Sequence, residues 1–95
     1  MNSVKIIRSS KADKKYMALF NIDGKKKITH FGQAGADDYT ITKDKQQKKR
    51  YLDRHRANEN WNDPLTAGAL SRWILWNKPS ITDSIASYKK RFNFN

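Results

Sequence analysis

Short apolar runs separated by turn residues occupy the first third of the chain. Val4–Arg8 is short and rich in β-branched residues, Lys15–Asn21 is apolar and partly aromatic, and Lys25–Phe31 follows after a turn at Asn21–Gly24. Two apolar runs across an Asp-Gly turn predict an antiparallel hairpin, with Gly24 suited to a positive φ. Val4–Arg8 is a candidate third strand, so we expect strands over about residues 3–31.

Residues 32–42 have the composition of a loop, with two glycines and the adjacent acids Asp37 and Asp38. A first helix is predicted over about residues 43–59. Thr42 is its candidate N-cap, and Asp44 lies near the positive end of the helix dipole.

A second helix is predicted over about residues 64–77, with Asp63 as cap, Pro64 at the first helical position and Pro79 beyond its end. Its apolar residues cover about half of the circumference, which is typical of a central buried helix. They are Leu65, Ala69, Leu70, Trp73, Ile74 and Trp76.

A third helix is predicted over about residues 80–92, opened by Ser80 with Asp83 at the capping-box position. Its narrow apolar stripe consists of Ile81, Ile85, Tyr88 and Phe92. An isolated hairpin is marginally stable in water, so the helices should cover one face of the strands. The predicted fold is α+β: an N-terminal antiparallel β-hairpin or three-stranded meander packed on three α-helices.

The length of the chain indicates one domain, and its composition gives a strong positive charge. The chain has 95 residues, which favours a single small basic domain over 1–95. It has no cysteine, no signal-peptide core, and no apolar run near the ~20 residues of a membrane span, so we expect a protein that is not secreted. Twenty Lys and Arg against nine acids give a net charge of +11, which favours polyanionic partners.

The densest positive charge lies in Lys43–Arg56, where seven of fourteen residues are Lys or Arg. As a helix, this segment has a thin seam of Tyr51, Leu52 and His55 between two basic flanks. Lys43, Arg50 and Arg54 form one flank, and Lys45, Lys49 and Arg56 form the other. The like-charged i,i+4 pairs within these flanks repel one another, and phosphates would relieve the repulsion.

The predicted nucleic-acid-binding residues are Lys43, Lys45, Lys49, Arg50, Arg54, Arg56, Lys89, Lys90 and Arg91. Which flank makes the contact is left open by the sequence. The alternative interpretation is a solvated charged face, supported by the acid–base spacings Asp44–Lys48 and Lys49–Asp53.

Other chemistry has weaker support. Trp73 and Trp76 lie on the apolar helix face and favour a core role, whereas Trp61 is open as a stacking platform for single strands. A metal-dependent nuclease would need convergent ligands, but the candidates have no recognised spacing. They are His30, Asp37, Asp38, His55 and Glu59. Gly32 and Gly35 lack the GK[ST] of a phosphate loop, and we predict no cofactor and no metal.

Three stretches resemble a family of small basic proteins of giant and other nucleocytoplasmic large DNA viruses. They are HFGQAGADDYT, TKDKQQKKRYLDRH and ENWNDPLTAGALSRWILWNKPSITDSIASYKKRF, and the most specific part is Thr66–Ser80. The resemblance implies a viral origin, a location in the virion or viral factory inside the host cell, and no catalytic residue.

The expected function is therefore non-catalytic, largely sequence-independent binding of nucleic acid, DNA rather than RNA, in viral genome packaging or organisation. The rival hypothesis is a minor structural protein of a viral capsid or core that acts through protein–protein contacts.

Overall fold

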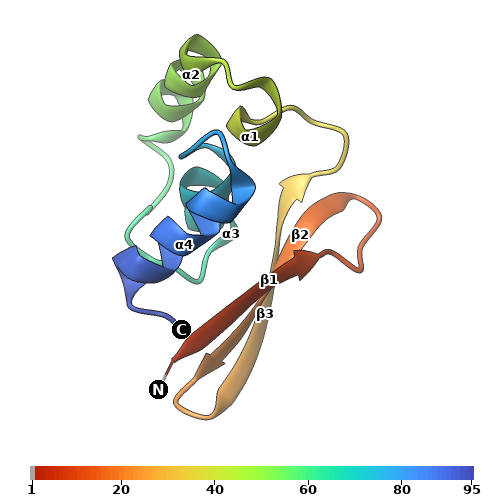
Figure 1. The fold of residues 1–95 in the computed structure, drawn as a ribbon, viewed down its shortest axis with the longest axis vertical. Helices are drawn as coiled ribbons and strands as arrows, with labels where there is room; N and C mark the ends of the chain where they lie inside the picture. Colours follow the sequence, from red (N-terminus) through yellow and green to blue (C-terminus); the bar gives the residue numbers. More distant parts are fainter. Residues whose placement is uncertain (1) are drawn as a thin grey trace.

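The computed structural model describes residues 2–95 and places a three-stranded sheet against a layer of helices (Figure 1). The strands are β1 (Ser3–Arg8), β2 (Lys14–Ile22) and β3 (Lys25–Gln33), in the order β1-β2-β3 with both pairings antiparallel. The helices follow in sequence and lie on one side of the sheet. The predicted α+β class is confirmed, with the three-stranded meander rather than the hairpin alone.

The turn between β2 and β3 has the backbone geometry that its two residues favour. Asp23 and Gly24 have φ values of 52° and 83°, and Ile22 pairs with Lys25 across them. A two-residue loop with both φ values positive matches the twist of the flanking strands. The predicted turn with a positive φ at Gly24 is confirmed.

Alternate residues of the sheet face the helices and form one side of the core. Val4 pairs with Phe20, and Tyr16 stacks on Phe31 at 5.9 Å between ring centroids. The core is completed by buried side chains from the helical layer. The buried hydrophobic residues are Val4, Ala18, Phe20, Phe31, Tyr39, Ala69, Leu70, Ile74, Leu75, Trp76 and Tyr88.

The predicted loop over 32–42 and helix over 43–59 are wrong at their boundaries. Strand β3 continues to Gln33, and a single helical turn, α1 (Tyr39–Thr42), follows a short loop. Lys43 then adopts a left-handed conformation with φ 54°, which ends α1 and separates it from α2 (Lys45–His55).

Capping explains these boundaries. The Asp38 carboxylate accepts the Thr40 N–H and starts α1, whereas the Asp44 carboxylate accepts the N–H groups of Gln46 and Gln47 and starts α2. The N-cap of the basic helix is therefore Asp44, and the prediction of Thr42 is wrong. Helix α2 ends at His55, so the predicted end near Glu59 is wrong. The Glu59 carboxylate contacts His55 and accepts the Trp61 indole N–H.

The second predicted helix, over 64–77, is shorter and less regular. Asp63 accepts the Leu65 N–H in a turn, and Thr66 caps α3 (Ala67–Leu70) through the Ala69 N–H. The chain continues as a π-helical segment, η1 (Ser71–Leu75), closed by the Trp76 N–H on the Ser71 carbonyl. Pro64 lies before the helix, so its predicted position is wrong.

The third helix agrees with its prediction. In α4 (Ile81–Phe92), Ser80 caps the Asp83 N–H, and Tyr88 lies fully buried in the middle of the apolar stripe. The chain then returns to the sheet, because Val4 and Asn95 are hydrogen-bonded through the backbone. The carboxyl end thus covers the start of the β1 edge.

Candidate nucleic-acid interface

Helix α2 is fixed against the rest of the protein by an aromatic stack. Tyr51 lies 4.3 Å from Trp76 between ring centroids, at an interplanar angle of 7°, and 4.2 Å from His55. Burial, with Glu59 nearby, raises the pKa of the Tyr51 hydroxyl to about 12. The Lys48 amine donates to the Asn77 carbonyl at 2.6 Å. These contacts set the rotation of α2, so its two basic flanks border different surroundings.

One flank of α2 joins cations from the other helices. Lys45, Lys48, Lys49 and Arg56 of this flank line one surface hollow. The charges of Arg72 and Lys78 lie near the Lys48 amine, and those of Arg56 and Arg91 lie near the Arg72 guanidinium. We call this surface the basic face. Its residues are Lys45, Lys48, Lys49, Arg56, Arg72, Lys78 and Arg91.

Two acids lie beside cations of the basic face. Asp53 pairs with Lys49 at 2.8 Å, and this hydrogen bond lowers the pKa of the Asp53 carboxyl. Asp83 borders a surface hollow with Lys78 and Lys90. Asp53 lines the same hollow as Lys45, Lys48 and Arg56, so one carboxylate lies within the basic face. Among residues 2–95, neither Lys48 nor Arg72 has a carboxylate partner.

Two cations of the basic face are partly buried among like charges. Burial lowers the pKa of the Lys48 amine, and Arg72, Lys78 and Lys45 lower it further. Burial likewise lowers the pKa of the Arg72 guanidinium, together with Arg91 and Arg56. A lowered pKa means that the surroundings disfavour the charged form, and a bound anion would favour it.

Arg72 belongs to a compact group of arginines and indoles, which we call the Arg–Trp cluster: Trp61, Arg72, Trp73 and Arg91. The Arg72 guanidinium carbon lies 4.2 Å from the centroid of the Trp73 ring and 5.4 Å from that of Trp61. The Arg91 guanidinium lies 3.7 Å from the Trp73 ring. Arg72 donates to the Trp76 carbonyl at 3.1 Å, and its buried Nε has no hydrogen-bond partner.

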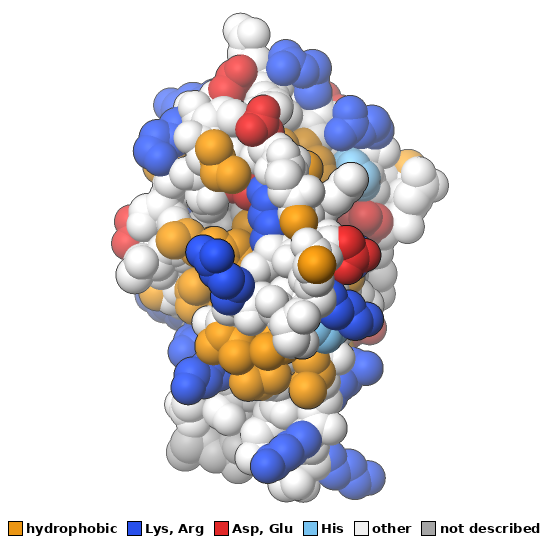
Figure 2. Space-filling model, turned by 90° about the vertical axis from the view of Figure 1, so that its right-hand side faces the viewer, with side chains coloured by type: hydrophobic (Ala, Val, Ile, Leu, Met, Phe, Trp, Pro, Cys, Tyr) orange, Lys and Arg blue, Asp and Glu red, His pale blue; other side chains and the backbone are white. Residues whose placement is uncertain are grey.

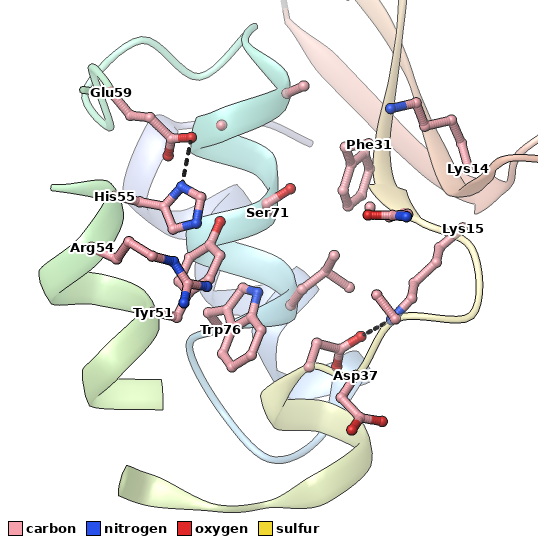
Figure 3. A pocket seen from close by; sticks show the side chains of 17 residues that line it. Lys14, Lys15, Phe31, Asp37, Tyr51, Arg54, His55, Glu59, Ser71 and Trp76 are labelled. Atoms are coloured by element: carbon pink, nitrogen blue, oxygen red, sulfur yellow. Dashed lines mark hydrogen bonds and ion pairs between the residues drawn. The ribbon is translucent and has the colours of Figure 1, made fainter. Parts of the chain in front are cut away.

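The other flank of α2 borders carboxylates. Arg50 and Arg54 line a hollow with Asp37, and Arg54 also lines a cleft of about 400 Å³ between α2 and the sheet (Figure 3). In this cleft Lys15 forms an ion pair with the buried Asp38 at 2.6 Å. This side of α2 places arginines beside the carboxylates of Asp37, Asp38 and Glu59, whereas the basic face joins α2 to further cations from η1 and α4.

The cleft brings together most of the residues considered for a nuclease. Glu59 lies 3.3 Å from His55 Nδ1 and accepts the Trp61 indole N–H at 2.9 Å. Asp37 lies on the opposite side (Figure 3), and Asp38 is paired with Lys15 in the same cleft. His30 is elsewhere, on β3, with Ser9 as its partner at 2.7 Å. Among residues 2–95, no three His, Cys, Asp or Glu side chains are grouped so as to hold a metal ion.

The remaining predicted contact residues do not form one surface. The Lys43 amine donates to the Thr40 carbonyl at 3.0 Å, and Lys43 lies outside α2, so its assignment to a flank is wrong. Consecutive residues of a helix point about 100° apart, so Lys89, Lys90 and Arg91 point in three directions. Arg91 joins the basic face, and Lys90 lies at its margin.

Sequence reasoning missed Lys48, Arg72 and Lys78 as site residues. Arg72 is a charge within the apolar run of the second predicted helix, flanked by Trp73, and this was the available signal. Its proximity to Trp61 and Arg91 depends on the packing of α4 and of the preceding loop, which no local pattern encodes.

The fold and the site define a small basic α+β protein with a surface on which cations from several helices cluster. Residues 4–55 match a protein family described as a family of unknown function (DUF5754), which is more than half of the chain. The chain therefore belongs to this family. The match covers the sheet, α1 and α2, and ends before the Arg–Trp cluster.

The other comparisons gave no relatives. No curated protein and no solved structure matches the chain significantly. Within residues 2–95, no helix has the length and apolar character needed to cross a membrane.

Proposed function

We propose that the protein binds nucleic acid, without catalysis, through contacts of its basic face with the phosphate backbone. The observation that carries the proposal is the hollow lined by Lys45, Lys48, Lys49 and Arg56, next to the partly buried Arg72. Burial, and after it neighbouring cations, lower the pKa values of Lys48 and Arg72. A phosphate placed among them would remove this repulsion and accept charge-assisted hydrogen bonds.

The proposed contacts are to backbone rather than to base edges. Phosphate contacts carry no sequence information, so we propose binding that is largely independent of sequence. DNA is the proposed polymer, and the viral resemblance of the sequence extends the proposal to packaging or organising a viral genome in a virion or viral factory. Arg50, Arg54 and Lys90 would add to the long-range attraction from outside the basic face.

A titration of DNA duplexes of unrelated sequence across salt concentration tests this function. Five to seven phosphate contacts are expected to give a slope of about −4 to −6 for log K against log salt, equal for all sequences. Gel shift or fluorescence anisotropy measures the slope. Absence of binding at low salt would overturn the proposal.

A second candidate function, assembly with another protein, is favoured by the uncovered face of the sheet. Ile28 is 58% exposed there and pairs with Leu19, which in turn pairs with Lys5. Ile7 pairs with Met17. Figure 2 shows a band of hydrophobic side chains bordered by basic ones. The lysines suit an acidic partner, such as a capsid or core protein, because a second copy with charge +11 would be repelled.

The partner proposed for the sheet face is an apolar surface bordered by carboxylates. A peptide of alternating Leu and Glu is expected to bind the wild-type chain. The Leu19→Glu variant is expected to lose this binding, while its affinity for DNA changes little. Failure of the peptide to bind, or self-association seen by sedimentation, would overturn this candidate.

A further inference from the structure

We propose that the preferred ligand of the basic face is single-stranded, with its bases stacked on the Arg–Trp cluster. This inference rests on the proposed function, because it names the form of nucleic acid that the same surface binds. The inference depends on a different observation from the proposed function, namely the planar side chains of the Arg–Trp cluster. Binding of a duplex backbone requires only the positive charge of this surface.

The cluster is held in place by hydrogen bonds within the protein. The Trp73 indole N–H donates to the Trp61 carbonyl at 2.9 Å, and the Trp61 indole N–H donates to Glu59 at 2.9 Å. Both rings are therefore oriented, and Arg72 is anchored on the Trp76 carbonyl. A platform that is ordered before binding loses little side-chain freedom when a ligand arrives.

The arginines of the cluster are available to a ligand. Within the described part of the chain, neither Arg72 nor Arg91 has a carboxylate partner, and Glu59 is already engaged with His55 and Trp61. The Arg91 side chain is exposed, although its guanidinium lies over Trp73. It therefore presents a planar cation to solvent, supported from below by an indole.

Such a group suits an unpaired nucleotide better than a base pair. Bases of single strands stack on aromatic rings and on guanidinium planes, and this stacking tolerates any sequence. In a duplex the faces of the bases are covered by their neighbours, so they cannot stack on a protein side chain. A strand whose phosphates follow Lys45, Lys49 and Arg56 could place bases on the outward plane of Arg91, which covers Trp73, and against Trp61.

The test compares three ligands of equal length, about 16 nucleotides, with the full chain: oligothymidylate, an abasic strand with the same phosphates, and a duplex. We expect oligothymidylate to bind about tenfold more tightly than the abasic strand at equal salt. We also expect it to quench tryptophan fluorescence, because bases would lie against Trp61 and on Arg91 above Trp73, while the abasic strand leaves the emission nearly unchanged.

A charge-conserving pair of variants separates stacking from charge. Arg91→Lys keeps the cation but removes the planar group, so affinity for oligothymidylate is expected to fall about five- to tenfold, with the abasic strand unaffected. Lys26→Arg, at an exposed lysine of β3 outside the basic face, is the matched control and is expected to change neither affinity.

Equal binding of oligothymidylate and the abasic strand would overturn the inference and leave the proposed function intact. Tighter binding of the duplex, or an Arg91→Lys effect equal on all three ligands, would overturn it as well. If none of the three ligands binds at low salt, the proposed function itself is overturned.

Discussion

Replacing both Lys45 and Lys49 with glutamate is expected to lower the affinity for nucleic acid by about 100-fold at low salt. Both side chains are exposed on the basic face, near the partly buried cations Lys48 and Arg72. Each reversal removes a phosphate contact with its counterion release and places a carboxylate in the path of the strand. The slope of log K against log salt is expected to become shallower by about 2.

The matched control for this variant is the replacement of Arg50 and Arg54 with glutamate. These residues have the same i,i+4 spacing on the same helix, are also exposed, and change the net charge equally. Because their flank shares its surface with Asp37 and with the acids of the cleft, we expect a loss of tenfold or less.

Fluorescence anisotropy at several salt concentrations measures both double variants, and circular dichroism checks that each remains folded. Equal losses for the two variants would show that only overall charge matters and would contradict the assignment of the contact to the basic face. A larger loss for Arg50 and Arg54 would move the contact to the cleft side of α2.

Local signals in the sequence were sufficient for those elements whose geometry is fixed by neighbouring residues. The Asp23–Gly24 turn requires positive φ values, which its two residues tolerate, and it sets the register of β2 and β3. Helix α4 is likewise defined by the Ser80 cap and by an apolar stripe that repeats with the helical period.

Elements that depend on unusual backbone or on tertiary contacts could not be predicted. Lysine rarely adopts a positive φ, so nothing in the sequence predicts that Lys43 interrupts the basic segment. The π-helical turn of η1 depends on how Trp76 packs between Tyr51 and the core, which is set by α2, far away in sequence.

The candidate site shows the same division. Lys45, Lys49 and Arg56 could be predicted as contact residues, because a dense run of charge is visible in the sequence itself. Choosing between the two flanks required knowing that Arg72 lies behind one and that carboxylates line the other. Those neighbours come from segments that only the folded chain brings together.

Truncating Tyr88 to alanine is expected to lower the free energy of unfolding by about 3–5 kcal/mol, a large share of the stability of a small domain. Tyr88 is fully buried, lies 5.1 Å from Phe92 and 5.8 Å from Phe94 between ring centroids, and donates its hydroxyl to the Pro64 carbonyl at 2.6 Å. Burial raises the pKa of this hydroxyl, so it remains a donor throughout the physiological range.

Tyr88→Phe is the matched control, because it keeps the ring and removes only the hydrogen bond to Pro64. We expect it to cost about 1–2 kcal/mol, since the carbonyl loses its donor in a partly buried position. Urea unfolding followed by tryptophan fluorescence measures both variants, and a loss below about 2 kcal/mol for Tyr88→Ala would contradict the role of Tyr88 in the core. Because Tyr88 also fixes α4, which carries Arg91 to Trp73, Tyr88→Ala should weaken single-strand binding more than Tyr88→Phe does.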